Sequence, residues 1–182
     1  MNKLKQQIIQ EITDSFANTN DAEIESLIND IDNAHKIFIY GLGREKIVLT
    51  SFAMRLMHLG YKVHIVGDVT TPALTEKDLL ITSSGTGYLS TVDALVDIAK
   101  DTDSRIAFFT AFPNEKLPQK ANTIIEIKAQ TMKSNSVDES IQPMGSLFEQ
   151  TQLLILEYII VKLIQKHQLK DEDMVLNHTN LE

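Results

Sequence analysis

Residues 79–90 read LLITSSGTGYLS, an apolar run followed by small hydroxylated residues and glycines. The run Leu79–Ser83 is typical of a buried β-strand, and a helix is expected after the glycines. Small residues let the backbone turn sharply, and the hydroxyls of Ser83, Ser84 and Thr86 can donate to anionic oxygens. The positive end of the helix dipole adds to this attraction. The stretch predicts a strand, a phosphate-binding loop and a helix, or, on a plainer interpretation, only a turn.

The same alternation extends along most of the chain. Short β-branched or aromatic runs predict four more strands, at residues 36–40, 62–66, 105–110 and 123–129. Helices are expected between them, including one over residues 44–59 that Gly60 stops. Two amphipathic helices, over residues 3–17 and from Asn20 onward, come before the first strand. The order predicts an α/β fold with a parallel sheet covered on both faces.

Two segments follow the last strand. Residues 130–143 are polar and are the longest stretch without apolar periodicity, which favours a functional loop. Residues 145–166 then form a helix with apolar residues on nearly every side. A helix of this kind is buried on all sides. We therefore expect one of its faces to meet another subunit.

Composition excludes several classes of protein. The 182 residues suit one domain, and 17 Lys and Arg against 25 Asp and Glu give a net charge of −8, which disfavours nucleic-acid binding. Without cysteine there is no disulfide, thiolate nucleophile or Cys-based metal site, and the histidines lack the spacing of a zinc helix. The apolar stretch 153–164 is too short to cross a bilayer, and residues 1–12 lack the apolar core of a secretory signal. We expect a cytoplasmic protein with no nucleic-acid or membrane partner.

Ligands of doubly wound sheets bind beyond the carboxyl ends of the strands. This rule points to residues 41–44, 67–72 and 83–90. No Gly-Lys-Ser/Thr ending follows residues 83–90, so nucleotide hydrolysis is not expected. Gly41-Leu42-Gly43 invites a dinucleotide site, but Lys46 stands where the third glycine is required, and we reject that hypothesis.

Two residues outside these loops are candidates for proton transfer. Glu149 lies in the first turn of the predicted long helix, where Ser146 and Glu149 also fit a capping box. His178 lies near the end of the sequence, where solvent exposure is the plainer interpretation. Spacing by itself favours the structural role for both.

Three further stretches carry a resemblance to a known family. They are residues 52–60 (FAMRLMHLG), 142–150 (QPMGSLFEQ) and 180–182 (NLE). With them, the chain resembles, over its whole length, the 6-phospho-3-hexuloisomerases of the sugar isomerase (SIS) domain superfamily. The resemblance implies a three-layer αβα sandwich with a five-stranded parallel sheet, flavodoxin-like in topology. It also implies one SIS domain over residues 1–182, with N-terminal helices at 1–34, the α/β core at 35–130 and C-terminal helices at 144–182.

The resemblance further implies a homotetramer that interconverts a 3-hexulose 6-phosphate and fructose 6-phosphate, with no metal or organic cofactor. The family's metabolic partner is the aldolase that joins formaldehyde to ribulose 5-phosphate, in the ribulose monophosphate pathway. An enediol intermediate requires a base, which would be Glu149, and an assisting acid or base, which would be His178 of the same or a neighbouring subunit. Substrate would be bound by Gly43, Arg44, Ser83, Ser84, Gly85, Thr86, Gly87, Tyr88 and Ser90.

The sequence departs from the family pattern in the expected ligand loops. After the first strand, the usual Gly-x-Gly-Arg-Ser-Gly is replaced by a sequence with Glu45 and Lys46 at its end. In the loop at 83–90, a usual Glu-Thr pair becomes Tyr88 and Leu89. On one interpretation Glu45 points away and Ser90 supplies the missing hydroxyl. On others the substrate has changed to a different phosphosugar, or the protein is a non-catalytic sugar-phosphate sensor.

Overall fold

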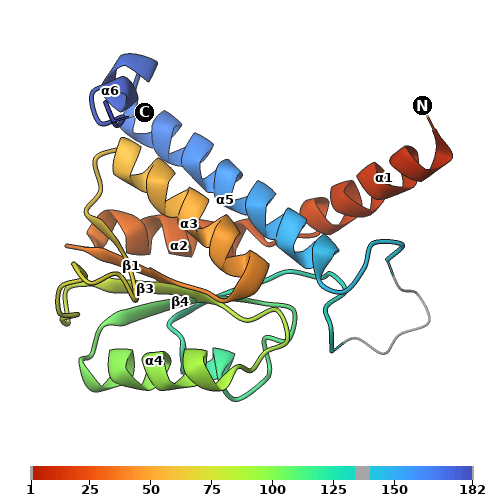
Figure 1. The fold of residues 1–182 in the computed structure, drawn as a ribbon, viewed down its shortest axis with the longest axis horizontal. Coiled ribbons are helices and arrows are strands. Elements are labelled where there is room, and N and C mark those ends of the chain that lie inside the picture. Colours follow the sequence, from red (N-terminus) through yellow and green to blue (C-terminus); the bar gives the residue numbers. More distant parts are fainter. Residues whose placement is uncertain (1, 134–139, 182) are drawn as a thin grey trace.

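The central sheet has five parallel strands in the order β2-β1-β3-β4-β5 (Figure 1). The computed structural model describes residues 2–133 and 140–181. The strands are β1 (Ile37–Tyr40), β2 (Val63–Ile65), β3 (Leu79–Ser83), β4 (Arg105–Thr110) and β5 (Thr123–Glu126). All five were predicted from the sequence, β3 and β4 with their bounds and the others with ends one to three residues too long. The parallel α/β sandwich is confirmed.

The order in which the chain adds strands to the sheet reverses between β1 and β3. From β1 the chain passes to β2 on one side and then returns to β3 on the other, so β1 pairs with both, with Tyr40 opposite Thr82. The turn after β1 and the loop after β3 therefore start side by side at the carboxyl edge of the sheet. In open α/β sheets, this is where ligands bind.

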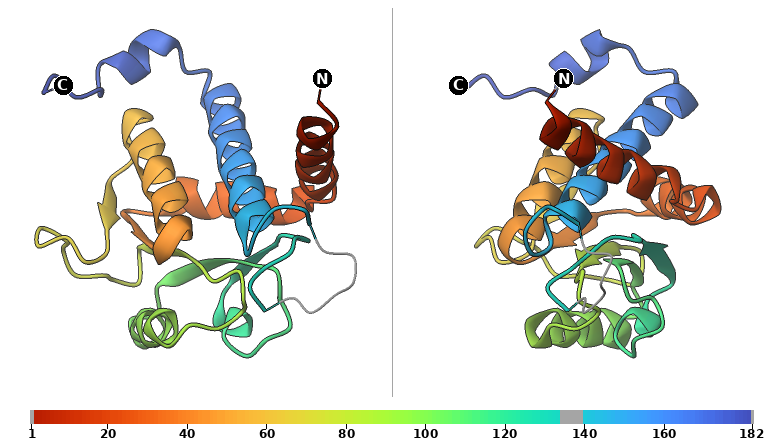
Figure 2. Two further views of the ribbon diagram at one scale, coloured as in Figure 1. Left: turned by 45° about the vertical axis from the view of Figure 1, so that its right-hand side comes forward. Right: turned by 90° about the vertical axis from the view of Figure 1, so that its right-hand side faces the viewer.

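Helices cover both faces of the sheet (Figures 1 and 2). They are α1 (Lys3–Ala17), α2 (Asp21–Asn33), α3 (Gly43–His58), α4 (Ser90–Asp101), α5 (Ser146–His167) and α6 (Asp171–Val175), with a short 3₁₀ turn at Pro118–Lys120. The helices α2, α3 and α5 share one core cluster with one face of the sheet, whereas α4 packs on the other face.

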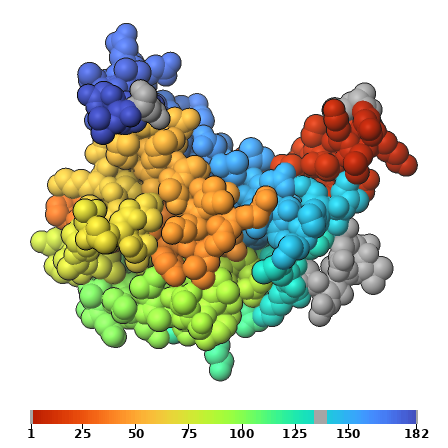
Figure 3. Space-filling view, in the orientation of Figure 1, coloured from red at the N-terminus to blue at the C-terminus, as the bar shows by residue number. Residues whose placement is uncertain are grey.

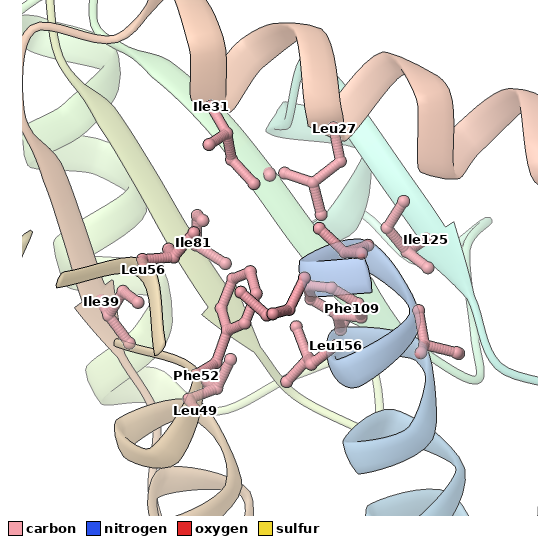
Figure 4. Packing of buried hydrophobic residues seen from close by; sticks show 14 of the residues in the cluster. Leu27, Ile31, Ile39, Leu49, Phe52, Leu56, Ile81, Phe109, Ile125 and Leu156 are labelled. Atoms are coloured by element: carbon pink, nitrogen blue, oxygen red, sulfur yellow. The ribbon is translucent and has the colours of Figure 1, made fainter. Parts of the chain in front are cut away.

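The alternation of side chains along the strands produces these two cores. Ile39 of β1 and Ile81 of β3 point toward α3 and α5, where they join Phe52 and Leu156 (Figure 4). Their neighbours Phe38 and Leu80 point the other way, into the cluster beneath α4. Burial on both faces explains why these strands read as continuous apolar runs in the sequence.

The helix α5 is apolar on its inner and outer sides, as predicted, and its bounds are one residue later than expected. Ile155, Ile159 and Leu163 are fully buried against the sheet. Leu153 and Val161 remain 36% and 48% exposed on its outer side. With α3 beside it, α5 forms much of the face seen in Figure 3.

The helix α1 extends away from the body of the molecule (Figures 1 and 2). Phe16, near its end, packs edge-on against Tyr158 of α5, with ring centroids 6.0 Å apart. Glu11 accepts hydrogen bonds from the Ser140 hydroxyl and the Ile141 N–H at 2.5 and 3.0 Å. The predicted loop 130–143 has no regular structure at 130–133 and 140–143, and its residues 134–139 lie outside the described part. Within residues 2–133 and 140–181, no helix is long and apolar enough to cross a membrane.

Candidate active site

The turn after β1 brings the start of α3 against the loop after β3. Gly41 allows this close approach, because a Cβ there would lie 2.9 Å from Leu49 Cδ1 and 3.1 Å from the Lys46 backbone. Gly43 begins α3 with a φ of +56°, a left-handed conformation that glycine adopts most easily. The two glycines thus direct Arg44 and Glu45, in the first turn of α3, toward the loop at 83–90.

The carboxylate of Glu45 lies inside the predicted phosphate loop. It accepts a hydrogen bond from the Ser83 hydroxyl, and the Gly85 N–H lies 3.2 Å from each of its two oxygens. The interpretation in which Glu45 points away from the loop is therefore wrong. A hydroxyl and an N–H that could bind a phosphate oxygen are already engaged by a carboxylate of the chain itself.

The surroundings of Glu45 disfavour its negative charge. Burial raises the pKa of the Glu45 carboxyl, the hydrogen bonds from Ser83 and Gly85 lower it, and the charge of Glu149 raises it again. The net effect is a raised pKa, because two donors replace only part of the hydration that the carboxylate has lost.

Glu149, the predicted base, lies in the first turns of α5 and faces the same pocket. The cap of α5 is Gly145 and no side chain caps its start, so the capping-box interpretation of Ser146 and Glu149 is wrong. Helix α5 begins at Ser146 itself, which places Glu149 one position too late for that motif. Its carboxylate instead accepts a hydrogen bond from Arg44 Nε in an ion pair. Only 16% of the Glu149 side chain is exposed, against 66% for Arg44.

Two cavities meet at Glu149. A small one, about 70 Å³, lies above the loop after β3 and is lined by Glu45, Gly85, Thr86, Thr131, Met132, Met144, Gly145, Phe148 and Glu149. A second, about 260 Å³, lies between α3 and α5 and is lined by Arg44, Ile47, Val48, Glu149, Gln150 and Leu153. Because Glu149 borders both cavities, a sugar phosphate reaching from the loop into the helix groove would pass the Glu149 carboxylate.

The other predicted loop residues have separate positions. The Ser84 and Thr86 hydroxyls lie 3.4 Å apart, and Thr86 donates to the Tyr88 carbonyl at 3.2 Å. Gly87 has a φ of +80°, and with Tyr88 it lines a different groove, next to Lys116 and Lys120. Ser90 is the first residue of α4. The Tyr88 side chain is thus placed away from the Glu149 pocket.

His178 lies far from Glu149 within one chain. Its ring stacks on His58, with centroids 5.0 Å apart, and its Nδ1 lies 2.9 Å from the Thr179 carbonyl oxygen. His58 ends α3 and Arg44 lies in its first turn, so the two are roughly 20 Å apart at the helical rise of about 1.5 Å per residue. His178 could act in the same pocket as Glu149 only if it came from a neighbouring subunit.

Sequence reasoning missed several residues of the pocket wall. Phe148 lies under Gly85, where an added Cβ would come within 3.1 Å of the ring. Thr131, Met132 and Met144 come from the irregular segments on either side of the residues that are not described. Phe148 and Met144 could have been found from their places in the stretch 142–150 that carries the family resemblance, but Met132 carries no pattern that marks it. In the part of the chain that the structure describes, no group of three His, Asp or Glu side chains could hold a metal ion.

Comparisons with known proteins show the family of the chain. The sequence pattern of the SIS domain family matches residues 30–153. The chain is 40% identical to a 3-hexulose-6-phosphate isomerase of Bacillus subtilis, over 97% of this chain and 96% of the relative. It is 33% identical to a 3-hexulose-6-phosphate isomerase of Methylomonas aminofaciens, over the full length of both.

A solved structure from Methanococcus jannaschii has the same fold. It is a hypothetical protein with an inferred function of 3-hexulose-6-phosphate isomerase, and it is 30% identical to this chain with a TM-score of 0.85, covering 99% of each chain. The resemblance seen in the sequence is thus confirmed. The chain belongs to the SIS domain family and, within it, to the sugar-phosphate isomerases that include the 3-hexulose-6-phosphate isomerases.

Proposed function

We propose that this sugar-phosphate isomerase interconverts 3-hexulose 6-phosphate and fructose 6-phosphate, with Glu149 as the base. The observation that carries the proposal is the position of the Glu149 carboxylate. It lies between the loop after β3 and the groove between α3 and α5, and the Arg44 guanidinium contacts it. An ionised carboxylate held at one point over the substrate carbons is what a shift of a carbonyl to its neighbour requires.

The reaction moves one proton between adjacent carbons and one between their oxygens. Glu149 would take the proton from the carbon beside the carbonyl, the electron pair of that C–H bond would form the double bond of an enediol, and the carbonyl oxygen would take up a proton from an assisting acid, which would be His178. Glu149 would then return the proton to the former carbonyl carbon, while the neighbouring hydroxyl gives its proton to the assisting group and its oxygen becomes the new carbonyl. General base catalysis of this kind contributes about 10²–10⁴ in rate. The Arg44 guanidinium would stabilise charge that develops on oxygen in the intermediate.

The apolar outer surface supports assembly of several copies. Ile47 and Met54 of α3 are 69% and 44% exposed, and Leu153 and Val161 of α5 lie on the same face. Exposed apolar groups that gather on one face are typical of protein interfaces. We propose a homotetramer, as the family resemblance implies, in which His178 of a neighbouring subunit assists Glu149. The cytoplasmic location and the place in the ribulose monophosphate pathway stay predictions.

The test is an isomerase assay started from fructose 6-phosphate, with formation of the 3-hexulose isomer followed directly. Glu149→Gln keeps the size of the side chain but removes the base, and we expect turnover to fall by at least about 100-fold. Glu76→Gln, on an exposed loop, makes the same change of charge outside the pocket and should leave turnover unchanged. Equal turnover of wild type and Glu149→Gln would remove Glu149 from the mechanism.

A second function, a non-catalytic sugar-phosphate sensor, is favoured by one observation. Glu45 occupies two hydrogen-bond donors of the loop that would otherwise serve the phosphate. A sensor would show a higher melting temperature with fructose 6-phosphate and no turnover at any enzyme concentration. Measurable isomer formation by the wild type, lost in Glu149→Gln, would exclude this alternative.

A further inference from the structure

The loop after β3 already holds an anion, the Glu45 carboxylate. The Ser83 hydroxyl donates to one of its oxygens and the Gly85 N–H is shared between both. A phosphate group needs donors of these same two kinds, hydroxyl and backbone N–H. An incoming anion must therefore either displace Glu45 or lie beside it.

The starts of two helices favour a negative charge at this place. The residues that cap α3 and α5 are Leu42 and Gly145, and neither makes a side-chain capping hydrogen bond. Uncapped helix starts present free N–H groups and the positive end of the helix dipole. Glu45, from the first turn of α3, lies where this positive potential is available.

In the described structure, the cationic side chain at the pocket is paired with Glu149 and not with Glu45. Arg44 pairs with Glu149, and none of the salt bridges between described residues includes Glu45. The remaining described groups that line the small cavity are Gly85, Thr86, Thr131, Met132, Met144, Gly145 and Phe148, none of which titrates. Glu45 thus faces one carboxylate from α5, one guanidinium turned toward that carboxylate, and a neutral wall.

We propose that Glu45 controls how tightly the loop after β3 binds the substrate's anionic end, because its carboxylate repels a second anion and occupies the Ser83 and Gly85 donors until the side chain rotates away. Anion binding at this loop is then coupled to the charge of Glu45. When Glu45 is ionised, it competes with the phosphate and repels it. When it is protonated, it no longer repels an anion and can itself donate a hydrogen bond. This inference deepens the proposed function and uses the same pocket.

The direction of the pH dependence follows from the burial of Glu45. Burial raises the pKa of this carboxyl, the Ser83 and Gly85 hydrogen bonds lower it, and Glu149 raises it further. Protonated Glu45 therefore persists to a higher pH than an exposed glutamate would. The affinity of the loop for an anion should rise as the pH falls through the range in which Glu45 takes up its proton.

The experiment measures anion binding separately from catalysis. Sulfate is the probe, since it stays a dianion over the range used, and its binding is followed by calorimetry at about pH 8 and about pH 4.5. Glu45→Ser removes the competing carboxylate, and Glu45→Gln keeps its size without its charge. We expect both variants to bind sulfate about tenfold more tightly than the wild type at about pH 8, and the difference to shrink at about pH 4.5.

Two controls make the outcome decisive. Glu76→Gln changes the net charge by the same amount on an exposed loop and should bind sulfate as the wild type does. A urea midpoint for each variant verifies that it is folded. Sulfate binding by Glu45→Gln and Glu45→Ser that is equal to or weaker than that of the wild type overturns the proposal, and so does an absence of binding in all of them.

Fructose 6-phosphate separates this inference from the proposed function. If both hold, Glu45→Ser lowers KM with little change in kcat. If neither wild type nor variant turns the sugar over but the sulfate result holds, the isomerase proposal fails and the role of Glu45 stands. If Glu45→Ser and Glu45→Gln raise KM instead, Glu45 is a substrate ligand and the inference fails.

Discussion

Two carboxylates near opposite ends of α5 have opposite electrostatic surroundings. Asp32, near the last turn of α5, accepts hydrogen bonds from the Tyr61 hydroxyl at 2.6 Å and pairs with His167 Nε2 and Lys166 Nζ, each at 2.8 Å. Glu45, near the first turn of α5, has a hydroxyl and an N–H as donors and a second carboxylate, Glu149, as its neighbour.

The pKa values of these two carboxyls shift in opposite directions. Burial alone would raise the pKa of Asp32, but the hydrogen bonds from Lys166, Tyr61 and His167, and the charge of His167, outweigh it and lower that pKa. For Glu45 burial dominates and the pKa is raised. Asp32 therefore stabilises the fold when ionised, whereas ionised Glu45 destabilises it. Unfavourable charge is concentrated at the end of the molecule where the ligand loops meet, as is common at functional sites.

The largest effect is expected from removing the single guanidinium at the site. Arg44→Met leaves Glu149 and Glu45 facing the pocket without their cation, and we expect kcat to fall by about 100-fold, the usual cost of losing a donor to developing charge. The free energy of unfolding should change by less than about 1 kcal/mol, because Arg44 is largely exposed. Isomerase kinetics and urea denaturation measure the two quantities.

Arg44→Lys is the matched variant for this prediction. Lysine keeps the charge but cannot reproduce the planar guanidinium, so kcat should lie between that of the wild type and that of Arg44→Met. Turnover of Arg44→Met within twofold of the wild type, by contrast, would show that the ion pair with Glu149 has no part in the chemistry.

A medium effect, on stability and not on turnover, is expected at the other end of α5. Asp32→Asn removes the charge that Lys166 and His167 contact and weakens the bond from Tyr61. We expect the free energy of unfolding to fall by about 1–2 kcal/mol, a range reduced for the exposure of Lys166 and His167. Urea denaturation at neutral pH gives the value. Asp68→Asn, an exposed position with the same change of charge, is the control, and an equal loss in both variants would contradict the role of the Asp32 cluster.

The smallest effect is a pH dependence with opposite sign at the two carboxylates. The Asp32 pKa is lowered from 3.8, so its contribution to stability is present above that pH and is lost as the pH falls through the lower, folded value. The Glu45 pKa is raised from 4.5, so stability is lost as the pH rises above 4.5 through the folded value. Glu45→Gln should therefore gain stability relative to the wild type as the pH rises.

Urea midpoints of wild type, Glu45→Gln and Asp32→Asn, taken at about pH 4.5 and about pH 8, test this sign. The gain of Glu45→Gln should be larger at the higher pH, whereas the loss of Asp32→Asn should be nearly the same at both, because the contribution of Asp32 is lost only below pH 3.8. A gain for Glu45→Gln that does not change between the two pH values would mean that the carboxylate is not penalised in the folded protein.

The sequence predicted the bounds of strands best where a strand is buried on both of its faces. The strands at 79–83 and 105–110 are buried on both faces, so their apolar runs have clear ends. The strand predicted at 123–129 ends at Glu126, because only residues 123–126 pair with β4, although Ile127 is buried beyond it. The capping-box interpretation of Glu149 failed because α5 begins at Ser146, one residue earlier than that motif requires.

The sequence by itself determined the order of strands and helices along the chain and the loops expected to bind a ligand, since each follows from local composition, and its family resemblance supplied Glu149 as the candidate base. The tertiary structure decided what these groups do to one another. Arg44 and Glu149 are 105 residues apart in the chain, and Glu45 and Gly85 are 40 apart. Their contacts depend on the parallel pairing of β1 with β3 and on the way α5 packs against α3. Neither a long-range pairing nor a side-chain direction can be read from local pattern, because both are set by packing that involves the whole domain.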